Sequence, residues 1–570
     1  MEQYIIYALV GNFLSGYDLI FWKLQDKETT QEQLVPIPSI ALLKHLKNQG
    51  KQVKLKLLVP HSLFIGKVEN QHLQDLAHLK EEYKYDVDNI FSLEYRKNLL
   101  KATIERGNSS TITKEFERFL SLLERLGFSS QIQNYKERWE KIEKQIKGKD
   151  KIEEEINKDL EKLLNDIIKS QKIKDTFEKL NEEWQKYKNN IEIEIIPSAG
   201  TYKNIEYSGW HYDSRVLYNY TIYVLDLLNT IDIFKNNKND LKIEVYLDVS
   251  VGLNALVSET LIAYMSALMF WQYLFLGEKN ISGEFYILSA EPVIGTPQKD
   301  VYKFHKEKLS YKVAFEKPLN WQQSQEILKS LKGVFSTQLL NELKEYINQI
   351  VLLFNSIKFN IPLAIPTFAP WKNFNDVFSF AKKIFVEFQN SCSISYKEKL
   401  SKVEPAKNLN LEFFDIRNLS YLLALGANIS KNLNVYLSNI NQPTGILCLS
   451  DKNLDKFKKL YNHYNLISNI AFLERDWMAL CSKNLSLNQQ WRSLCKAMNK
   501  RKKRSCNNIQ KNFERNFLAH SGFEYNVTLI RKAPYSNDCK VKNLINCKDL
   551  REIKYEDKYK DSIKKLILEL

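Results

Sequence analysis

Short apolar runs alternate with amphipathic stretches along the first half of the chain. Five runs have the length of strands, and several of them end at glycine, proline or small polar residues. They predict strands at residues 4–10, 54–59, 191–196, 243–249 and 285–288. The stretches between them predict helices at residues 40–47, 212–231 and 253–276. Because strands that are apolar on both faces alternate with helices, we expect a mostly parallel sheet with helices on each side, an α/β fold.

A different pattern fills residues 112–190, between the second and third predicted strands. Apolar residues recur there every three to four positions, no proline is present, and 18 Lys+Arg stand against 17 Asp+Glu. This spacing predicts a helical insertion, a hairpin of two or three helices. Its charge is close to zero, so we interpret it as a protruding or partner-contacting arm rather than an RNA-binding element.

After residue 298 the alternation stops and helical spacing dominates, with segments rich in proline or polar residues between the helices. Helices are predicted at residues 321–331, 339–354, 374–389, 411–425 and 454–464. The fold class is therefore α/β plus all-α. We expect an α/β domain at 1–298 with the insertion at 112–190, a helical linker region at 299–405, and an all-α domain at 406–570.

The formal net charge of the 570 residues is +15, which favours polyanionic partners such as nucleic acid. All seven cysteines lie between Cys392 and Cys547 without a CxxC pair, so we expect no disulfide framework. The first residues lack the pattern of a signal peptide. The most apolar stretch, residues 261–277, contains Ser266 and Gln272 and predicts a core helix. We expect a cytoplasmic protein with no membrane partner.

The strongest chemical signal is the segment Arg515-Asn516-Phe517-Leu518-Ala519-His520-Ser521-Gly522, which follows a basic run. Histidine can give or take a proton near neutral pH, and arginine presents a charged fork to phosphate oxygens. RNA cleavage by the substrate's own 2′-hydroxyl needs both groups. Asn516 and His520 lie four positions apart on one helix face. Arg515 and His520 are separated by about 140°, so both reach one phosphate only if the helix bends or two copies meet.

This segment closely resembles the R-x4–6-H motif of HEPN ribonucleases, above all of the branch fused behind a CARF domain in type III CRISPR systems. The resemblance implies a Rossmann-like CARF sensor followed by a helical HEPN domain. It also implies metal-independent cleavage of single-stranded RNA in a composite site made by a homodimer or a higher oligomer. His520 would act as acid and base, Arg515 as phosphate clamp and Asn516 as support.

The predicted strand ends carry small or polar residues, and ligands of open α/β sheets bind at the carboxyl ends of strands. The segment from Asp248 to Asn254 resembles the CARF pattern D-x-[ST]-H-G-x-N, which implies an activator of the cyclic oligoadenylate class, usually cyclic tetra-adenylate. Val251 stands where that family often has histidine, which argues against cleavage of the bound activator. The expected ligand residues are Gly11, Asn12, Ser198, Ala199, Gly200, Asp248, Ser250, Gly252 and Asn254.

No glycine-rich nucleotide motif and no metal-ligand spacing occur in the sequence, so we expect no cofactor and no metal. Two other functions remain open. The chain could be a non-catalytic nucleotide sensor or regulatory RNA-binding scaffold, or a toxin-type ribonuclease that needs no nucleotide signal.

Overall fold

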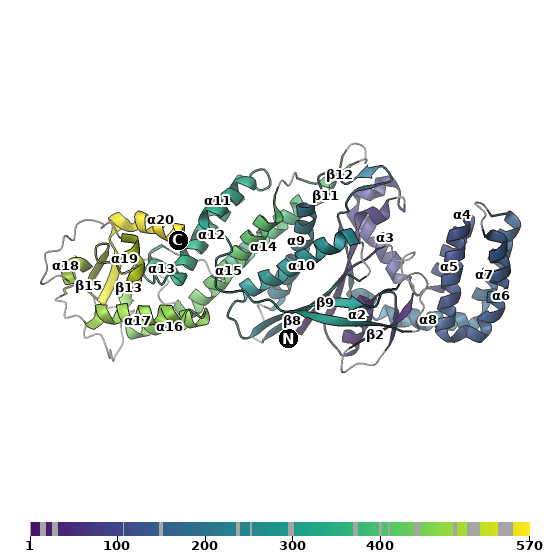
Figure 1. Ribbon diagram of the computed structural model, residues 1–570, viewed down its shortest axis with the longest axis horizontal. Coiled ribbons are helices and arrows are strands. Elements are labelled where there is room, and N and C mark those ends of the chain that lie inside the picture. The colour runs from purple at the N-terminus through teal and green to yellow at the C-terminus, as the bar shows by residue number, and fades with distance from the viewer. Residues whose placement is uncertain are drawn as a thin grey trace.

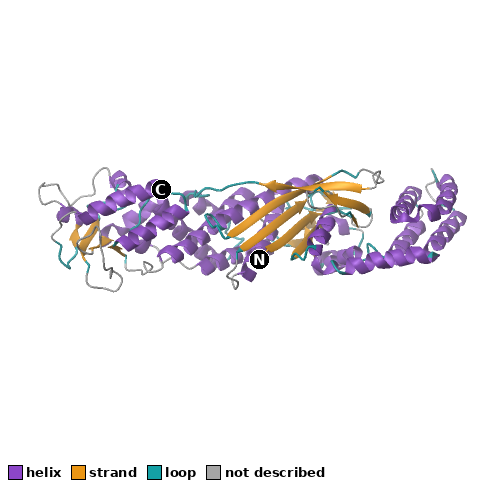
Figure 2. Cartoon of the chain, turned by 90° about the horizontal axis from the view of Figure 1, so that it is seen from below, coloured by secondary structure: helices purple, strands orange, loops and turns teal. Residues whose placement is uncertain are grey.

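The structure is a computed structural model, elongated in Figure 1, with a helical lobe at one end and the C-terminal elements at the other. It describes residues 2–11, 19–25, 32–65, 67–106, 108–147, 152–234, 240–250, 254–293, 301–368, 374–397, 402–407, 411–437, 445–482, 487–498, 513–533 and 551–570. A large twisted sheet lies between the two ends (Figure 2).

The five predicted strands are confirmed, and they form the parallel centre of an eight-stranded sheet in the order β9-β8-β1-β4-β5. Their apolar side chains are almost entirely buried, because helices cover both faces of the sheet. The bounds are β1 (Glu2–Leu9), β4 (Val53–Pro60), β5 (Ile191–Ile196), β8 (Leu241–Asp248) and β9 (Ile281–Ala290).

Three further strands extend the β9 side of this sheet, and none of them was predicted. β10 (Val301–Leu309) pairs antiparallel with β9, β2 (Ile20–Leu24) runs parallel to β10, and β3 (Gln33–Val35) closes the edge. Because β10 begins after residue 298, the sheet extends beyond the boundary expected there.

Helices cover the sheet as predicted. Parallel connections are right-handed, so α2 (Pro38–Asn48) and α3 (Leu76–Asp88) share one face of the sheet. The return crossovers place α9 (Tyr212–Phe234) and α10 (Asn254–Leu274) together on the opposite face (Figure 1).

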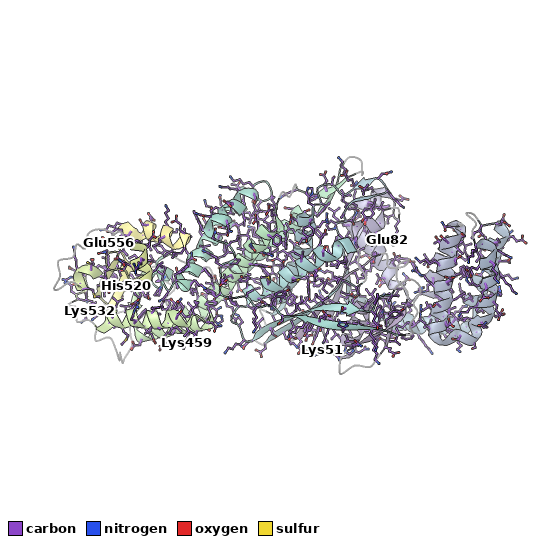
Figure 3. The ribbon with its side chains drawn as sticks, viewed as in Figure 1. Lys51, Glu82, Lys459, His520, Lys532 and Glu556 are labelled. Carbon is purple, nitrogen blue, oxygen red and sulfur yellow. The ribbon has the colours of Figure 1, made fainter. Side chains whose placement is uncertain are left out.

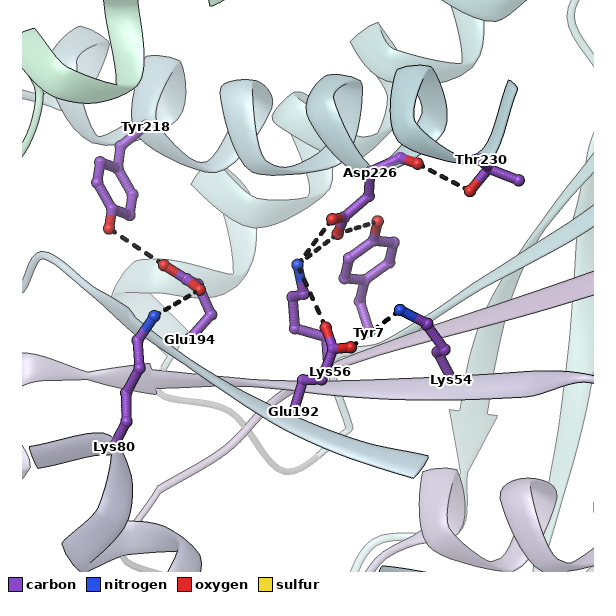
Figure 4. A network of polar contacts seen from close by, with 9 residues as sticks. All are labelled: Tyr7, Lys54, Lys56, Lys80, Glu192, Glu194, Tyr218, Asp226 and Thr230. Atoms are coloured by element: carbon purple, nitrogen blue, oxygen red, sulfur yellow. Dashed lines mark hydrogen bonds and ion pairs between the residues drawn. The ribbon is translucent and has the colours of Figure 1, made fainter. Parts of the chain in front are cut away.

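A partly buried polar network joins α9 to the sheet (Figure 4). Asp226 of α9 accepts hydrogen bonds from Lys56 of β4, at 2.6 and 2.8 Å, and from the hydroxyl of Tyr7 of β1, at 2.9 Å. In the same network, Glu194 of β5 forms an ion pair with Lys80 of α3, with 3.0 Å between the charged atoms. Each of these partly buried charges thus has an opposite partner, which offsets the cost of removing it from water.

The insertion contains four helices in residues 112–190 rather than two or three. Its helices form the lobe at one end of the molecule (Figures 1 and 2), so the expectation of a protruding arm agrees with its shape. Phe116 and Trp139 stack at 4.8 Å between ring centroids inside it. The four helices are α5 (Ser109–Leu123), α6 (Ser129–Ile146), α7 (Glu154–Lys169) and α8 (Gln171–Gln185), and α4 (Leu93–Arg106) precedes them.

The second half is mainly helical, as predicted, and α14 and α15 pack against α9 and α10. The five predicted helices there correspond to α11, α12, α14, α15 and α16. The bounds are α11 (Trp321–Ser330), α12 (Thr337–Lys358), α13 (Ala364–Phe368), α14 (Phe374–Ser391), α15 (Phe413–Leu437), α16 (Asp451–His463), α17 (Ile467–Ser482), α18 (Leu494–Met498), α19 (Phe513–Ala519) and α20 (Lys560–Glu569).

Two small sheets interrupt the helices, and the sequence predicted neither. One lies inside the C-terminal domain in the order β13-β16-β15-β14, and the other joins β11-β12-β7-β6. Their strands are β6 (Thr201–Tyr202), β7 (Ile205–Glu206), β11 (Ile394–Lys397), β12 (Lys402–Pro405), β13 (Ile446–Leu449), β14 (Arg492–Ser493), β15 (Thr528–Lys532) and β16 (Arg551–Tyr555).

The cysteines of the C-terminal domain differ from one expectation. Cys448, Cys481 and Cys495 are disulfide-bonded, although no disulfide framework was expected from the sequence. Cys392 is a buried free thiol. Within the described parts of the chain, no helix combines the length and the apolar character needed to cross a membrane.

Candidate functional site

The predicted catalytic segment forms the short helix α19 and the turn that ends it. Phe517 is fully buried and packs on Tyr555, with ring centroids 5.9 Å apart, and this contact anchors the helix. Because Phe517 holds one face of α19 against the protein, Arg515 is exposed and Asn516 is partly exposed on the other faces of the helix. His520 follows the last helical residue and lies in the C-terminal domain, at the end of the molecule away from the lobe (Figure 3).

The turn after α19 has a fixed, unusual backbone. Ser521 adopts a left-handed φ of 51° and Gly522 one of 73°, and the amide of Gly522 donates to the carbonyl of Phe517 at 2.8 Å. A side chain at Gly522 would meet Ile361, so glycine is needed at this C-cap. The amide of His520 still donates to the carbonyl of Asn516 at 3.2 Å, which fixes the backbone position of the imidazole.

The side chain of His520 is partly exposed and stacks on the ring of Tyr525, with centroids 5.5 Å apart and planes 29° apart. Burial raises the pKa of the Tyr525 hydroxyl, so the ring stays neutral. Burial also raises the pKa of the neighbouring Glu524, whose carboxylate accepts hydrogen bonds from the amides of Asn526 and Val527. Glu524 thus stabilises the turn that carries Tyr525.

An unpredicted arginine lies beside His520. Arg475 of α17 donates from Nη2 to the carbonyl of Ala519 at 2.9 Å, and from Nε to Asp476 at 2.9 Å. Asp476 in turn accepts a 2.8 Å hydrogen bond from the hydroxyl of Ser521. That hydroxyl also accepts from the side-chain amide of Asn360 at 2.9 Å. Residues of α17 therefore brace the backbone on both sides of His520.

Arg475 could have been found only through its helix. Leu473, Trp477 and Leu480 recur at helical spacing and are all buried, so a signal for α17 was present in the sequence. In the sequence alone, Glu474-Arg475-Asp476 is an ordinary surface charge cluster, and nothing there connects it with His520.

His520 and Asn516 are joined by a backbone hydrogen bond, and within the described residues no side-chain hydrogen bond links the two. In the described part of the chain, no hydrogen bond or ion pair joins Arg515 to His520. This separation agrees with the helical angle of about 140° between the two positions. Most of the basic run that precedes Arg515, residues 499–512, lies outside the described residues.

The second candidate site is the carboxyl edge of the parallel sheet. The carbonyl of Gly11 accepts a 2.6 Å hydrogen bond from Tyr83, and Gly200 adopts a left-handed φ of 87° at an exposed turn next to Ala199. Ser250 is exposed at the end of β8. Asn254 begins α10, while its side chain, together with Asn12 and Gly252, lies outside the described residues.

Two of the expected ligand residues point into the protein instead. Ser198 is buried, and its hydroxyl accepts a 2.9 Å hydrogen bond from the amide of Ser62, which joins the ends of β5 and β4. Asp248 is fully buried and accepts from the amide of Ser39 at 3.1 Å and from Ser250. Burial raises the pKa of Asp248, and the hydrogen bonds from Ser250 and Ser39 lower it. The side chains of Ser198 and Asp248 therefore hold the backbone at the carboxyl edge of the sheet through buried hydrogen bonds.

The parallel sheet with its edge of glycine and small polar residues, joined to a helical domain with an Arg-x4-His turn, defines a CARF–HEPN protein. That class comprises CRISPR-associated ribonucleases that sense cyclic oligoadenylate. Residues 5–292 match the family model for the CARF domain of the CRISPR system endoribonuclease Csx1, and residues 452–537 match the model for its HEPN domain. The chain therefore belongs to the Csx1 family. No curated protein matches it.

Proposed function

We propose that this protein cuts single-stranded RNA without a metal ion, in a site shared by two copies of the chain. Binding of a cyclic oligoadenylate, with cyclic tetra-adenylate as the first expectation, would switch the cleavage on. The main support is the position of His520, which is held on a braced turn in the matched HEPN segment while its imidazole stays accessible to solvent.

The chemistry requires only groups that the chain supplies. His520 takes the proton of a 2′-hydroxyl, whose oxygen attacks the adjacent phosphorus. The bond from phosphorus to the 5′-oxygen breaks, and that oxygen receives the proton from the His520 imidazolium. The products are a 2′,3′-cyclic phosphate and a free 5′-hydroxyl. The guanidinium of Arg515 holds the non-bridging oxygens as their charge increases, and Asn516 supports the imidazole.

The test is cleavage of a fluorophore–quencher RNA in EDTA and cyclic tetra-adenylate. His520→Ala should lower the rate by about two to four orders of magnitude, the usual contribution of a general acid–base. His305→Ala is the control, because His305 is exposed on β10 and pairs with Glu307 at 3.1 Å, away from the site. Unchanged cleavage by His520→Ala contradicts the assignment. If the wild-type protein cleaves RNA without EDTA but not with it, the proposal that no metal ion is needed is contradicted.

The same assay without activator tests regulation. The proposal expects slow cleavage until cyclic tetra-adenylate is added. Equal rates with and without it would favour a ribonuclease that needs no nucleotide signal. Nucleotide binding without any RNA cleavage would favour a non-catalytic sensor.

A further inference from the structure

Arg475 is a cation at the candidate active site that the proposed reaction does not use. Its side chain is 54% exposed although it belongs to a helix whose opposite face is buried. It also lies beside the residue that precedes His520, because it donates to the carbonyl of Ala519. An arginine keeps its charge at any physiological pH, so the guanidinium stays protonated even though it pairs with Asp476 at 2.9 Å.

The contacts of Arg475 leave much of its guanidinium available. One N–H donates to Asp476 and one to Ala519, and within the described residues the other three N–H groups have no partner. The Phe472 ring lies 5.2 Å from the guanidinium carbon, so one flat face is supported. A guanidinium that is held by one carboxylate and one ring, with N–H groups still available, is preorganised for a phosphate.

We propose that Arg475 binds a phosphate of the RNA backbone at the His520 site, as a second phosphate-binding residue besides Arg515. This inference rests on the proposed function, since it requires RNA to lie against His520. Asp476 positions the guanidinium while it also accepts from Ser521, so phosphate binding and the position of the imidazole depend on the same carboxylate.

A simpler explanation is that Arg475 only caps the C-terminal end of α19 through the Ala519 carbonyl. Two substitutions separate these roles. Arg475→Gln removes the charge but keeps an amide that can donate to Ala519, whereas Arg475→Lys keeps the charge and loses the fork. If Arg475 only caps α19, the Arg475→Gln variant should bind RNA as the wild type does. A phosphate contact predicts that the lysine variant is the milder one.

The molecule also offers a matched control. Arg417 of α15 stacks over Phe414, three residues earlier, at 4.6 Å, and bonds to Asn418, the next residue, at 3.3 and 3.1 Å. This Phe-x-x-Arg arrangement repeats that of Phe472, Arg475 and Asp476 on a different helix. Arg417→Gln therefore removes an equivalent charge without touching α19.

The experiment measures binding of a fluorescent single-stranded RNA to the full chain at several salt concentrations, in a His520→Ala background that prevents cleavage. Arg475→Gln should weaken binding about tenfold and lower the slope of log affinity against log salt by about 0.7, the value for one phosphate. Arg475→Lys should keep most of the slope, and Arg417→Gln should keep all of it. Circular dichroism checks that each variant is folded.

An unchanged slope in a folded Arg475→Gln variant overturns the inference, as does an equal loss in Arg417→Gln. If the glutamine variant does not fold, the lysine variant decides. The affinity of Arg475→Lys for RNA should then stay within a few-fold of wild type, and its slope of log affinity against log salt should be unchanged. A reduced slope overturns the proposal. Failure of the proposed function would be seen in a different experiment. It would appear in the RNA cleavage assay described above, as cleavage that does not depend on His520, whereas the present experiment measures only binding.

Discussion

His61 shows how a buried residue at the sheet edge sets a pH dependence. It is fully buried, donates from Nε2 to the carbonyl of Leu73 at 3.2 Å, and accepts at Nδ1 from Tyr207 at 2.6 Å. The neutral imidazole satisfies both contacts, whereas a protonated ring would face the Tyr207 hydroxyl with a second donor. Burial lowers the pKa of His61 from 6.5 to about 4.

As the pH falls, His61 binds a proton in the unfolded chain at a higher pH than in the folded chain. The neutral buried His61 therefore contributes its full stabilisation of the fold above pH 6.5, and this contribution is lost as the pH falls toward 4. We expect His61 to reduce the free energy of unfolding by about 2 kcal/mol between neutral pH and about pH 5. Thermal melting at the two pH values measures it. His61→Gln should narrow the difference in melting temperature, His305→Gln should not, and an equal difference in both variants contradicts this account.

At the residue scale, the sequence located the catalytic candidates but not their surroundings. Arg515, Asn516 and His520 were found from residue chemistry and the motif, and the structure places the first two on α19 and His520 in the turn that follows it. Asp248 was found by the same means, yet its carboxylate is turned inward to the amide of Ser39. Side-chain direction at a strand end depends on the helix that packs there, which lies 209 residues away in sequence, so a local pattern cannot reveal it.

At the element scale, α10 joins the candidate ligand edge to the helices of the second half of the chain. It begins at Asn254 on the ligand edge and ends against the C-terminal half of the chain. There the side-chain amide of Asn428, from α15, donates to the carbonyls of Leu274 and Leu276 at 3.2 and 3.1 Å. His463 of α16 also bonds to Leu276, at 3.0 Å. If ligand binding shifts α10, these contacts would pass the shift to α15 and α16.

Asn428→Ala should weaken this connection. We expect cyclic tetra-adenylate to bind as in wild type but to activate RNA cleavage at least several-fold less, because coupling depends on contacts that differ between two states. The matched control is Asn355→Ala. Asn355 is equally buried and bonds to the carbonyl of Ile567 at 2.6 Å, away from α10, so it should lower stability by a similar 1–3 kcal/mol without changing activation. Equal activation in both variants contradicts a role for this joint.

The elements that the sequence predicted are those with a large buried face. The five parallel strands and the long helices have continuous or periodic apolar patterns, which burial requires. β3 has three residues and β14 has two, too few for any period, and β10 ends in a polar stretch because it lies near the sheet edge. Such strands form through pairing with distant partners, which a local pattern does not contain.

At the scale of the whole molecule, the lobe and the candidate RNA site lie at opposite ends (Figures 1 and 3). On α17, the helix that contacts the His520 turn, Ile467, Phe472 and Met478 are 70%, 50% and 37% exposed. Exposed apolar residues gathered on one helix are typical of a surface that another molecule covers, and a second copy would bring two His520 turns together.

The central claim is that Arg515 of one copy and His520 of another act on the same phosphate, and a mixing experiment tests it most directly. Arg515→Ala and His520→Ala chains are each expected to be inactive alone. When they are co-expressed, half of the dimers are mixed, and each mixed dimer has one intact pair, so the account predicts recovery of about a quarter of wild-type RNA cleavage. No recovery, with mixed dimers shown to be present, would place both groups in one chain and contradict the shared site.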